Sequence, residues 1–228
     1  YPLRPRPELP EGDGILIYPG ESFGTNKICT SVRLERWRDG AEDYDMLVLY
    51  EKKLGRSAAL SLLNNVYKSP SNYTDQSKYA LALRKNLIEN IQNKYFDMQH
   101  HLFYRLLIIS CTFFLISCQQ TIECYLIPST DKASDFHKVQ PQNSGTLFLA
   151  KNEAEHIQIV FKGCPGETYK IHRNGNDDNS IRYSCRQIKS VYGFDDALVP
   201  IDGEQITLND SIAKLWITFR TAESIRPG

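Results

Sequence analysis

From Met98 to Cys118 the sequence reads MQHHLFYRLLIISCTFFLISC, and this stretch divides the chain in two. A short flank that ends in Arg105 precedes an apolar run from Leu106 to Ile116, and the small residue Ser117 stands directly before Cys118. This order is typical of a lipoprotein signal peptide. Such a signal belongs at an N-terminus, yet 97 residues precede this one.

A transmembrane helix and a buried core helix are the two other interpretations of this stretch. A membrane-spanning helix needs about 20 apolar residues. The apolar run after Arg105 is roughly half that length, which matches the apolar region of a signal peptide. A core helix stays open as an alternative. The signal interpretation predicts that Cys118 is the lipidated first residue of a mature protein, because several acyl chains together give stable membrane anchoring.

We therefore expect three regions, namely residues 1–97, the signal at 98–118, and residues 119–228. The second half is expected in the cell envelope, either anchored by lipid to the outer membrane or periplasmic. The first half would be exported as part of its own parent protein. A disulfide between Cys164 and Cys185 is compatible with an oxidising periplasm.

The overall composition is that of an ordinary soluble protein with balanced charge. Lys and Arg total 27, and Asp and Glu also total 27. A neutral chain without a basic stripe lacks the electrostatic footprint of phosphate binding, so we expect no nucleic-acid partner. The histidines and cysteines show no paired ligand spacing, so we predict no structural zinc or other metal, and no cofactor.

The first half begins with a short apolar run, Ile15 to Tyr18, bounded by glycines. Such a run predicts a strand buried on both faces, as in a parallel barrel. A helix follows, with Ser31 or Thr30 as its N-cap and Gly55 at its end. One face of this helix carries Leu34, Trp37, Ala41, Tyr44 and Val48 at steps of three and four residues.

The charged side of this helix is expected to be a scaffold. Arg38 and Glu42 lie one turn apart and can pair. Charges along one helix are usually solvated or salt-bridged, so we assign no catalytic role to the charged residues of this helix. They are Arg33, Glu35, Arg38, Asp39, Glu42 and Asp43. Two further helices are predicted, at about residues 57–68 and 75–95. In the second of these helices an apolar stripe can dock on the preceding helix. The stripe consists of Leu83, Leu87 and Ile91.

Strands dominate the second half. His156 to Phe161 alternates polar and apolar residues, and so do Ile181 to Arg186 and Leu215 to Phe219. Trp216 and Thr218 are expected on the face opposite to that of Leu215 and its alternating apolar partners. Asn174-Gly175 marks a hairpin connection. Short alternating strands separated by turns predict an antiparallel β-sandwich.

Parts of both halves resemble glycoside hydrolase family 123. In the first half the resemblance rests on GDGILIYPG (residues 12–20), SVRLE (31–35) and RDGAEDY (38–44), which are similar to the family's C-terminal region. In the second half NEAEHIQIV (152–160), DALVP (196–200) and LWIT (215–218) are similar, more loosely, to the strands of its N-terminal sandwich. The chain therefore resembles the C-terminal part of one such protein, followed by a signal peptide and then by the N-terminal part of another. We expect two neighbouring genes read as one frame, with stop-codon recoding or a genuine fusion as the alternative.

The resemblance implies an α+β composite: a C-terminal fragment of a (β/α)8 barrel with closing helices, a signal helix and a truncated β-sandwich. Barrel active sites lie at the C-terminal ends of strands, which makes Tyr18 the candidate substrate-binding residue, with a turn into the next loop as the alternative. The family resembles enzymes that remove β-linked N-acetylgalactosamine with retention, using the substrate's acetamido group as nucleophile. A glycan or glycoconjugate is therefore the expected substrate.

The family's catalytic residues are an adjacent Asp-Glu pair, and this sequence contains no Asp-Glu dipeptide. We therefore assign no catalytic residue and expect no hydrolysis by this polypeptide alone. The alternative is a non-catalytic surface lipoprotein that binds carbohydrate or protein through its sandwich. Sandwiches serve many functions, so the fold does not choose between the two.

Overall fold

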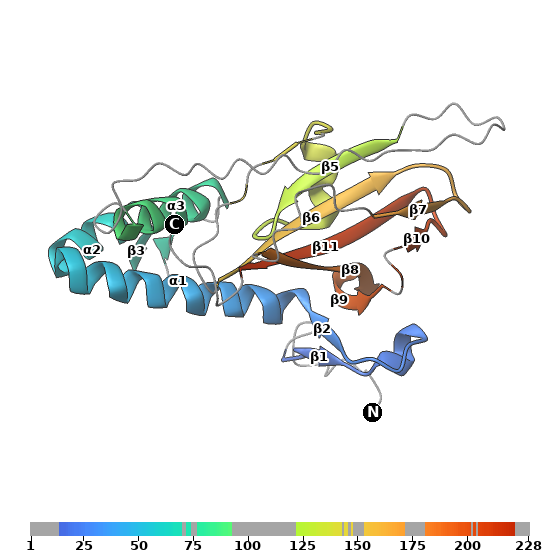
Figure 1. The fold of residues 1–228 in the computed structure, drawn as a ribbon, viewed down its shortest axis with the longest axis horizontal. Coiled ribbons are helices and arrows are strands. Elements are labelled where there is room, and N and C mark those ends of the chain that lie inside the picture. The colour runs from blue at the N-terminus through green and yellow to red at the C-terminus, as the bar shows by residue number, and fades with distance from the viewer. Residues whose placement is uncertain are drawn as a thin grey trace.

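A seven-stranded antiparallel sheet and a group of three helices make up the fold (Figure 1). The computed structural model describes residues 14–69, 72–73, 77–92, 122–142, 144–145, 147, 153–171, 181–201, 203 and 205–221. The stretch from Met98 to Cys118 and the predicted hairpin at Asn174-Gly175 lie outside these residues. In spatial order the sheet contains β1 (Ile17–Tyr18), β2 (Cys29–Ser31), β9 (Phe194–Pro200), β8 (Ile181–Val191), β11 (Ile212–Thr221), β6 (Ala154–Lys162) and β5 (Glu123–Pro128).

The smaller elements surround this sheet and the helices. Two-stranded sheets are formed by β7 (Thr168–Lys170) with β10 (Gln205–Thr207), and by β3 (Tyr67–Ser69) with β4 (Asn72–Tyr73). The helices are α1 (Val32–Leu54), α2 (Arg56–Leu63) and α3 (Ser77–Gln92), with short 3-10 turns η1 (Gly20–Phe23) and η2 (Ala133–Lys138). Mixed helices and antiparallel strands confirm the predicted α+β class.

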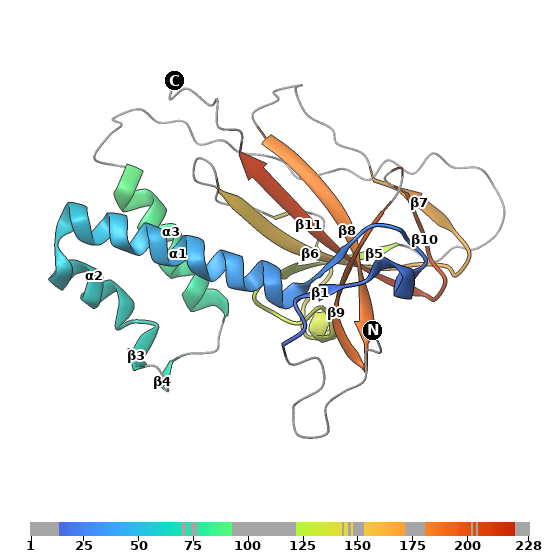
Figure 2. The same ribbon diagram turned by 90° about the horizontal axis from the view of Figure 1, so that it is seen from below.

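The two halves of the sequence share one sheet. β2 pairs antiparallel with β9, and Thr30 and Ser31 lie opposite Leu198 and Ala197. Figure 2 shows α1 leaving β2 and running across one side of the sheet before it reaches the other helices. The first and second halves therefore pack as one unit, an arrangement that no local sequence pattern predicts.

β1 differs from the expected barrel strand. Among the described strands it pairs with β2 alone, at the edge of the sheet, and Ile17 is 58% exposed. All strand pairs among the described residues are antiparallel. The expectation of a strand buried on both faces in a parallel barrel is therefore wrong for β1. A strand with a neighbour on one side only leaves part of its surface to solvent.

α1 begins and ends where its capping residues predict. The Ser31 hydroxyl accepts a hydrogen bond from the Leu34 N–H at 3.1 Å, and Gly55, with a φ of 91°, follows the last turn. The apolar face predicted from sequence is largely solvent-facing, since Trp37 is 71% and Tyr44 is 66% exposed. The opposite face, with Glu35, is buried instead because the sheet surface beneath it is polar.

The described residues form four apolar clusters, of which one joins β1 and β2 to β9 through Tyr18, Cys29, Ala197 and Val199, and the other three are larger. One lies between the sheet and the β7–β10 pair and contains Ile157, Ile159, Phe161, Leu215 and Ile217, as the alternation predicts. A second lies on the other sheet face, where Trp216 packs with the first turn of α1 and with η2. The third joins the helices: Leu87 of α3 packs against Met46 and Tyr50 of α1, and Leu83 and Ile91 flank it. The stripe is therefore buried as predicted, but it packs mainly on α1, and the preceding helix α2, which the sequence predicted as its partner, contributes Ala59.

Among the described residues no helix is both long and apolar enough to cross a membrane. Cys164 and Cys185 are not joined by a disulfide in the structure.

Candidate functional site

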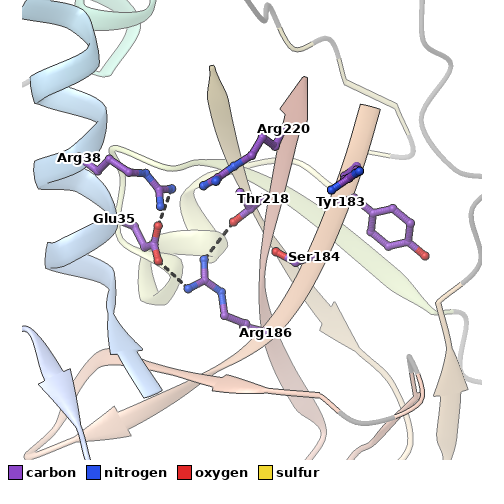
Figure 3. A pocket seen from close by; sticks show the side chains of 8 residues that line it. Glu35, Arg38, Tyr183, Ser184, Arg186, Thr218 and Arg220 are labelled. Carbon is purple, nitrogen blue, oxygen red and sulfur yellow. Dashed lines mark hydrogen bonds and ion pairs between the residues drawn. The ribbon is translucent and has the colours of Figure 1, made fainter. Parts of the chain in front are cut away.

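A pocket of about 310 Å³ lies where α1 crosses β8 and β11 (Figure 3). The register of the two strands builds its floor: Ser184 lies opposite Thr218, and Arg186 lies opposite Trp216. Residues two apart on a strand share a face, so these positions bring arginines and hydroxyls to the side that α1 covers. The described residues that line the pocket are Glu35, Arg38, Arg182, Tyr183, Ser184, Arg186, Thr218 and Arg220.

Glu35 is the central charge of the pocket. Its side chain is 4% exposed, and it lies 2.5 Å from Arg186 Nη1 and 2.6 Å from Arg38 Nη2. The Thr30 hydroxyl also donates to Glu35 at 3.1 Å. Burial alone would raise the pKa of Glu35, but the hydrogen bond from Arg186 and the charges of Arg186 and Arg38 lower it. Glu35 is therefore a fixed carboxylate near neutral pH.

Arg186 connects the floor to the helix. One of its terminal nitrogens donates to Glu35 and to the Thr30 hydroxyl, and the other donates to the Thr218 hydroxyl at 3.0 Å. Its Nε is buried and has no hydrogen-bond partner among the described residues. The guanidinium is thus held in place from both halves of the sequence.

The wall behind the pocket is a buried polar group around His156. The Trp216 indole N–H donates to His156 Nδ1 at 3.1 Å, and an indole nitrogen can only donate. The other ring nitrogen, Nε2, is 3.0 Å from Asp39 Oδ1. Arg38 also lies against this ring, with its Nη2 2.6 Å from Nε2. These contacts fix α1 on the sheet at the level of the pocket.

Arg36 holds α1 from its other side. Its Nε donates to the Ser129 carbonyl at 2.7 Å, and its Nη2 donates to the Asp131 carbonyl at 2.5 Å. Burial lowers the pKa of Arg36, although nearby aspartates oppose this effect. A second buried ion cluster lies further along α1, where Arg84 of α3 contacts Asp43, Glu153 and other carboxylates.

Tyr18, the substrate-binding residue predicted from sequence, does not line this pocket. Tyr18 is fully buried: its hydroxyl donates to Asp196 and accepts from Arg33 Nη2 at 3.2 Å. Burial, followed by the hydrogen bond to Asp196, raises the pKa of Tyr18 well above its usual value. Substrate contact by Tyr18 stays a prediction, and the structure uses the residue to join β1 to β9. Cys118 lies outside the described residues.

The lining residues of the pocket were not identified from sequence as a site. The sequence predicts Glu35 and Arg38 as part of a salt-bridged scaffold. Their ion pair and the 3.8 Å contact between Arg38 and Glu42 agree with that prediction. The available signal was the alternation of Arg182, Ser184 and Arg186, which places three polar side chains on one face of a strand.

Comparisons with protein-family models and with curated protein sequences find no match to this chain. The fold and the site by themselves define an α+β protein with an arginine-lined pocket between a helix and an antiparallel sheet.

Proposed function

We propose that this chain is a non-catalytic, glycan-binding module of a protein related to glycoside hydrolase family 123, and that the pocket beneath α1 is its binding site. The observation that supports binding over catalysis is the charge content of the pocket. Of the described residues that line it, four are arginines and one, Glu35, is a carboxylate.

Glycoside hydrolysis with retention requires more than this. A carboxylic acid must protonate the leaving oxygen, and a second carboxylate must stabilise the reacting group. Arg186 and Arg38 lower the pKa of Glu35, so this residue is a poor proton donor near neutral pH. The pocket therefore supports recognition of a ligand without its turnover.

Hydrogen-bond donors dominate the described lining, which suits an oxygen-rich ligand. Guanidinium groups only donate, whereas the hydroxyls of Ser184 and Thr218 both donate and accept. Small-ligand pockets typically measure about 300–1,000 Å³, so a volume near 310 Å³ fits one sugar ring. Together with the family resemblance, these features favour a glycan.

The outer face of α1 supports the proposal that the chain derives from larger proteins. Trp37 and Tyr44 lie seven residues apart and are 71% and 66% exposed. Residues seven apart lie on one side of a helix, and a shared exposed apolar surface commonly marks a contact with another part of a protein. We propose that residues 1–97 come from the closing segment of a (β/α)8 barrel and residues 119–228 from a truncated β-sandwich domain.

The Met98 to Cys118 stretch belongs to the same proposal. Processing of the signal would place a lipid anchor on Cys118 and locate residues 119–228 in the cell envelope. Residues 1–97, exported with their own parent protein, would complete the pocket there through the pairing of β2 with β9. Mass spectrometry of the chain from cells tests this point. A diacylglyceryl thioether on Cys118 supports it, and an unprocessed full-length chain contradicts it.

Binding without hydrolysis can be measured on the purified full chain. We expect methyl β-N-acetylgalactosaminide to bind in a ligand-observed NMR titration, and p-nitrophenyl β-N-acetylgalactosaminide to stay intact under the same conditions. Ser184→Trp should abolish binding because the larger side chain fills the pocket. Ser190→Trp is the matched control, because Ser190 is also an exposed serine of β8 but does not line the pocket.

Two results would contradict the proposal. Release of p-nitrophenol by the full chain would show catalysis. Equal loss of binding in the Ser184→Trp and Ser190→Trp variants would place the ligand elsewhere.

A further inference from the structure

We infer that the ligand of this pocket carries an oxyanion, a carboxylate or a sulfate ester on the sugar, and that Arg182 and Arg220 bind it. This inference rests on the proposed glycan-binding function and adds the chemical class of the ligand. It follows from the placement of these two arginines, which take part in none of the ion pairs formed among the described residues.

Arg182 and Arg220 are directly opposite one another on neighbouring strands, β8 and β11. Like charges at directly opposed positions of an antiparallel pair repel and destabilise the sheet. Both side chains are exposed, and the ion pairs formed among the described residues include neither. The fold thus keeps two adjacent positive charges that oppose its own stability.

Within the described part of the chain, the carboxylates near the pocket already contact other groups. Glu35 lies between Arg186 and Arg38, and Asp39 lies against His156. Figure 3 shows Arg220 on the same side of the sheet as Glu35 and Arg38, while the Tyr183 ring points away from them. The lining therefore has four guanidinium groups for one carboxylate, and the excess positive charge is concentrated at Arg182 and Arg220.

Guanidinium groups suit an oxyanion because their planar N–H forks bind carboxylate, sulfate or phosphate oxygens in pairs. Arg186 adds a further donor, since its buried Nε has no hydrogen-bond partner among the described residues. Ser184, in the next register position on the same face of β8, is exposed, and its hydroxyl can contact a sugar hydroxyl. A uronic acid or a sulfated hexosamine supplies both kinds of group in one ring.

The test is a calorimetric titration of the full chain with four probes: N-acetylgalactosamine, N-acetylgalactosamine 6-sulfate, glucuronic acid and sodium sulfate. We expect at least one of the charged sugars to bind about ten-fold tighter or more than N-acetylgalactosamine. This preference should weaken as salt is raised, because part of the attraction is between charges. Comparing the sulfated sugar with the uronic acid identifies which oxyanion is preferred.

The variants are Arg182→Gln and Arg220→Gln, with Arg56→Gln as the control. Arg56 is an arginine of α2 whose side chain is 78% exposed and does not line the pocket. We expect each pocket variant to lose the preference for the charged sugar and to unfold at the same temperature as the wild type or higher, because a repulsive pair has been removed. A lowered melting temperature with unchanged binding would show that these arginines are structural and would overturn the inference.

The outcomes separate this inference from the proposed function. Equal affinity for neutral and charged sugars overturns the oxyanion inference but leaves glycan binding in place. Sodium sulfate binding as tightly as the sulfated sugar shows an anion site without sugar recognition, which contradicts both. Binding by none of the sugars also contradicts both.

Discussion

Replacing Glu155 by glutamine should remove most of a marked dependence of stability on pH. Glu155 of β6 is 6% exposed, and its carboxylate lies 2.8 Å from Arg84 Nε. Burial raises the pKa of Glu155 to about 8, and the charges of Asp39, Glu153 and Asp43 act in the same direction, while Arg84 opposes them. The ordinary pKa of the group is 4.5.

The sign and size of the effect follow from proton linkage. Between pH 4.5 and about 8 the native state holds a proton on Glu155 that the unfolded chain has lost, so stability falls as pH rises. One proton corresponds to about 1.4 kcal/mol per pH unit. From pH 5.5 to pH 7.5 the wild type should therefore lose roughly 2.7 kcal/mol through this group.

The Glu155→Gln variant cannot ionise at this position and resembles the protonated acid in shape and hydrogen bonding. Its free energy of unfolding should exceed that of the wild type by about 1.4 kcal/mol at pH 5.5 and by about 4 kcal/mol at pH 7.5. The assay is urea unfolding followed by circular dichroism at both pH values. Burial also raises the pKa of Asp43, to about 6. Asp43 therefore adds a smaller loss of stability with rising pH in both proteins.

Glu89→Gln is the matched control, because Glu89 lies on α3 with its side chain 47% exposed. This variant should follow the wild-type pH dependence. If the wild type and Glu155→Gln lose stability in parallel between pH 5.5 and pH 7.5, Glu155 titrates normally and the reasoning is refuted.

Three further results are expected. Ser31→Ala should lower the unfolding free energy by about 1 kcal/mol in urea titrations, because the Leu34 N–H loses its cap, and an unchanged midpoint would contradict this. Glu35→Ala should lower the unfolding free energy by about 3–5 kcal/mol, because it leaves Arg186 buried without its partner. The double variant Glu35→Ala, Arg186→Met should recover part of that loss. If the losses of the two single variants simply add in the double variant, the pair is uncoupled. Residues 1–97 and 119–228, expressed together as separate chains, should copurify because β2 pairs with β9 and Glu35 pairs with Arg186; separate elution would contradict the shared sheet.

Several elements could be predicted from the sequence because their signals are local. Alternation over His156 to Phe161 and Leu215 to Phe219 identified two core strands and their buried faces, which the structure confirms. Ser31 and Gly55 marked both ends of α1 for the same reason, since a cap acts on the adjacent turn of the chain.

The candidate site could not be predicted in this way. Apolar spacing gave one face of α1, with Trp37 and Tyr44, but the helix buries the face with Glu35. Which face is buried depends on the partner surface, and that surface is a row of arginines, hydroxyls and His156 supplied by the other half of the chain. A charged helix face is buried only where a distant element provides the opposite charges.

The sequence by itself therefore determined the strands of the second half, the limits of the long helix, the docking stripe of α3 and the α+β class, because each depends on residues a few positions apart. Only the tertiary structure decided that β2 joins β9, that Glu35 pairs with Arg186, and that Arg182 lies opposite Arg220. These are contacts between segments that are remote in the sequence. Their register depends on long-range pairing and packing, which a local pattern does not record.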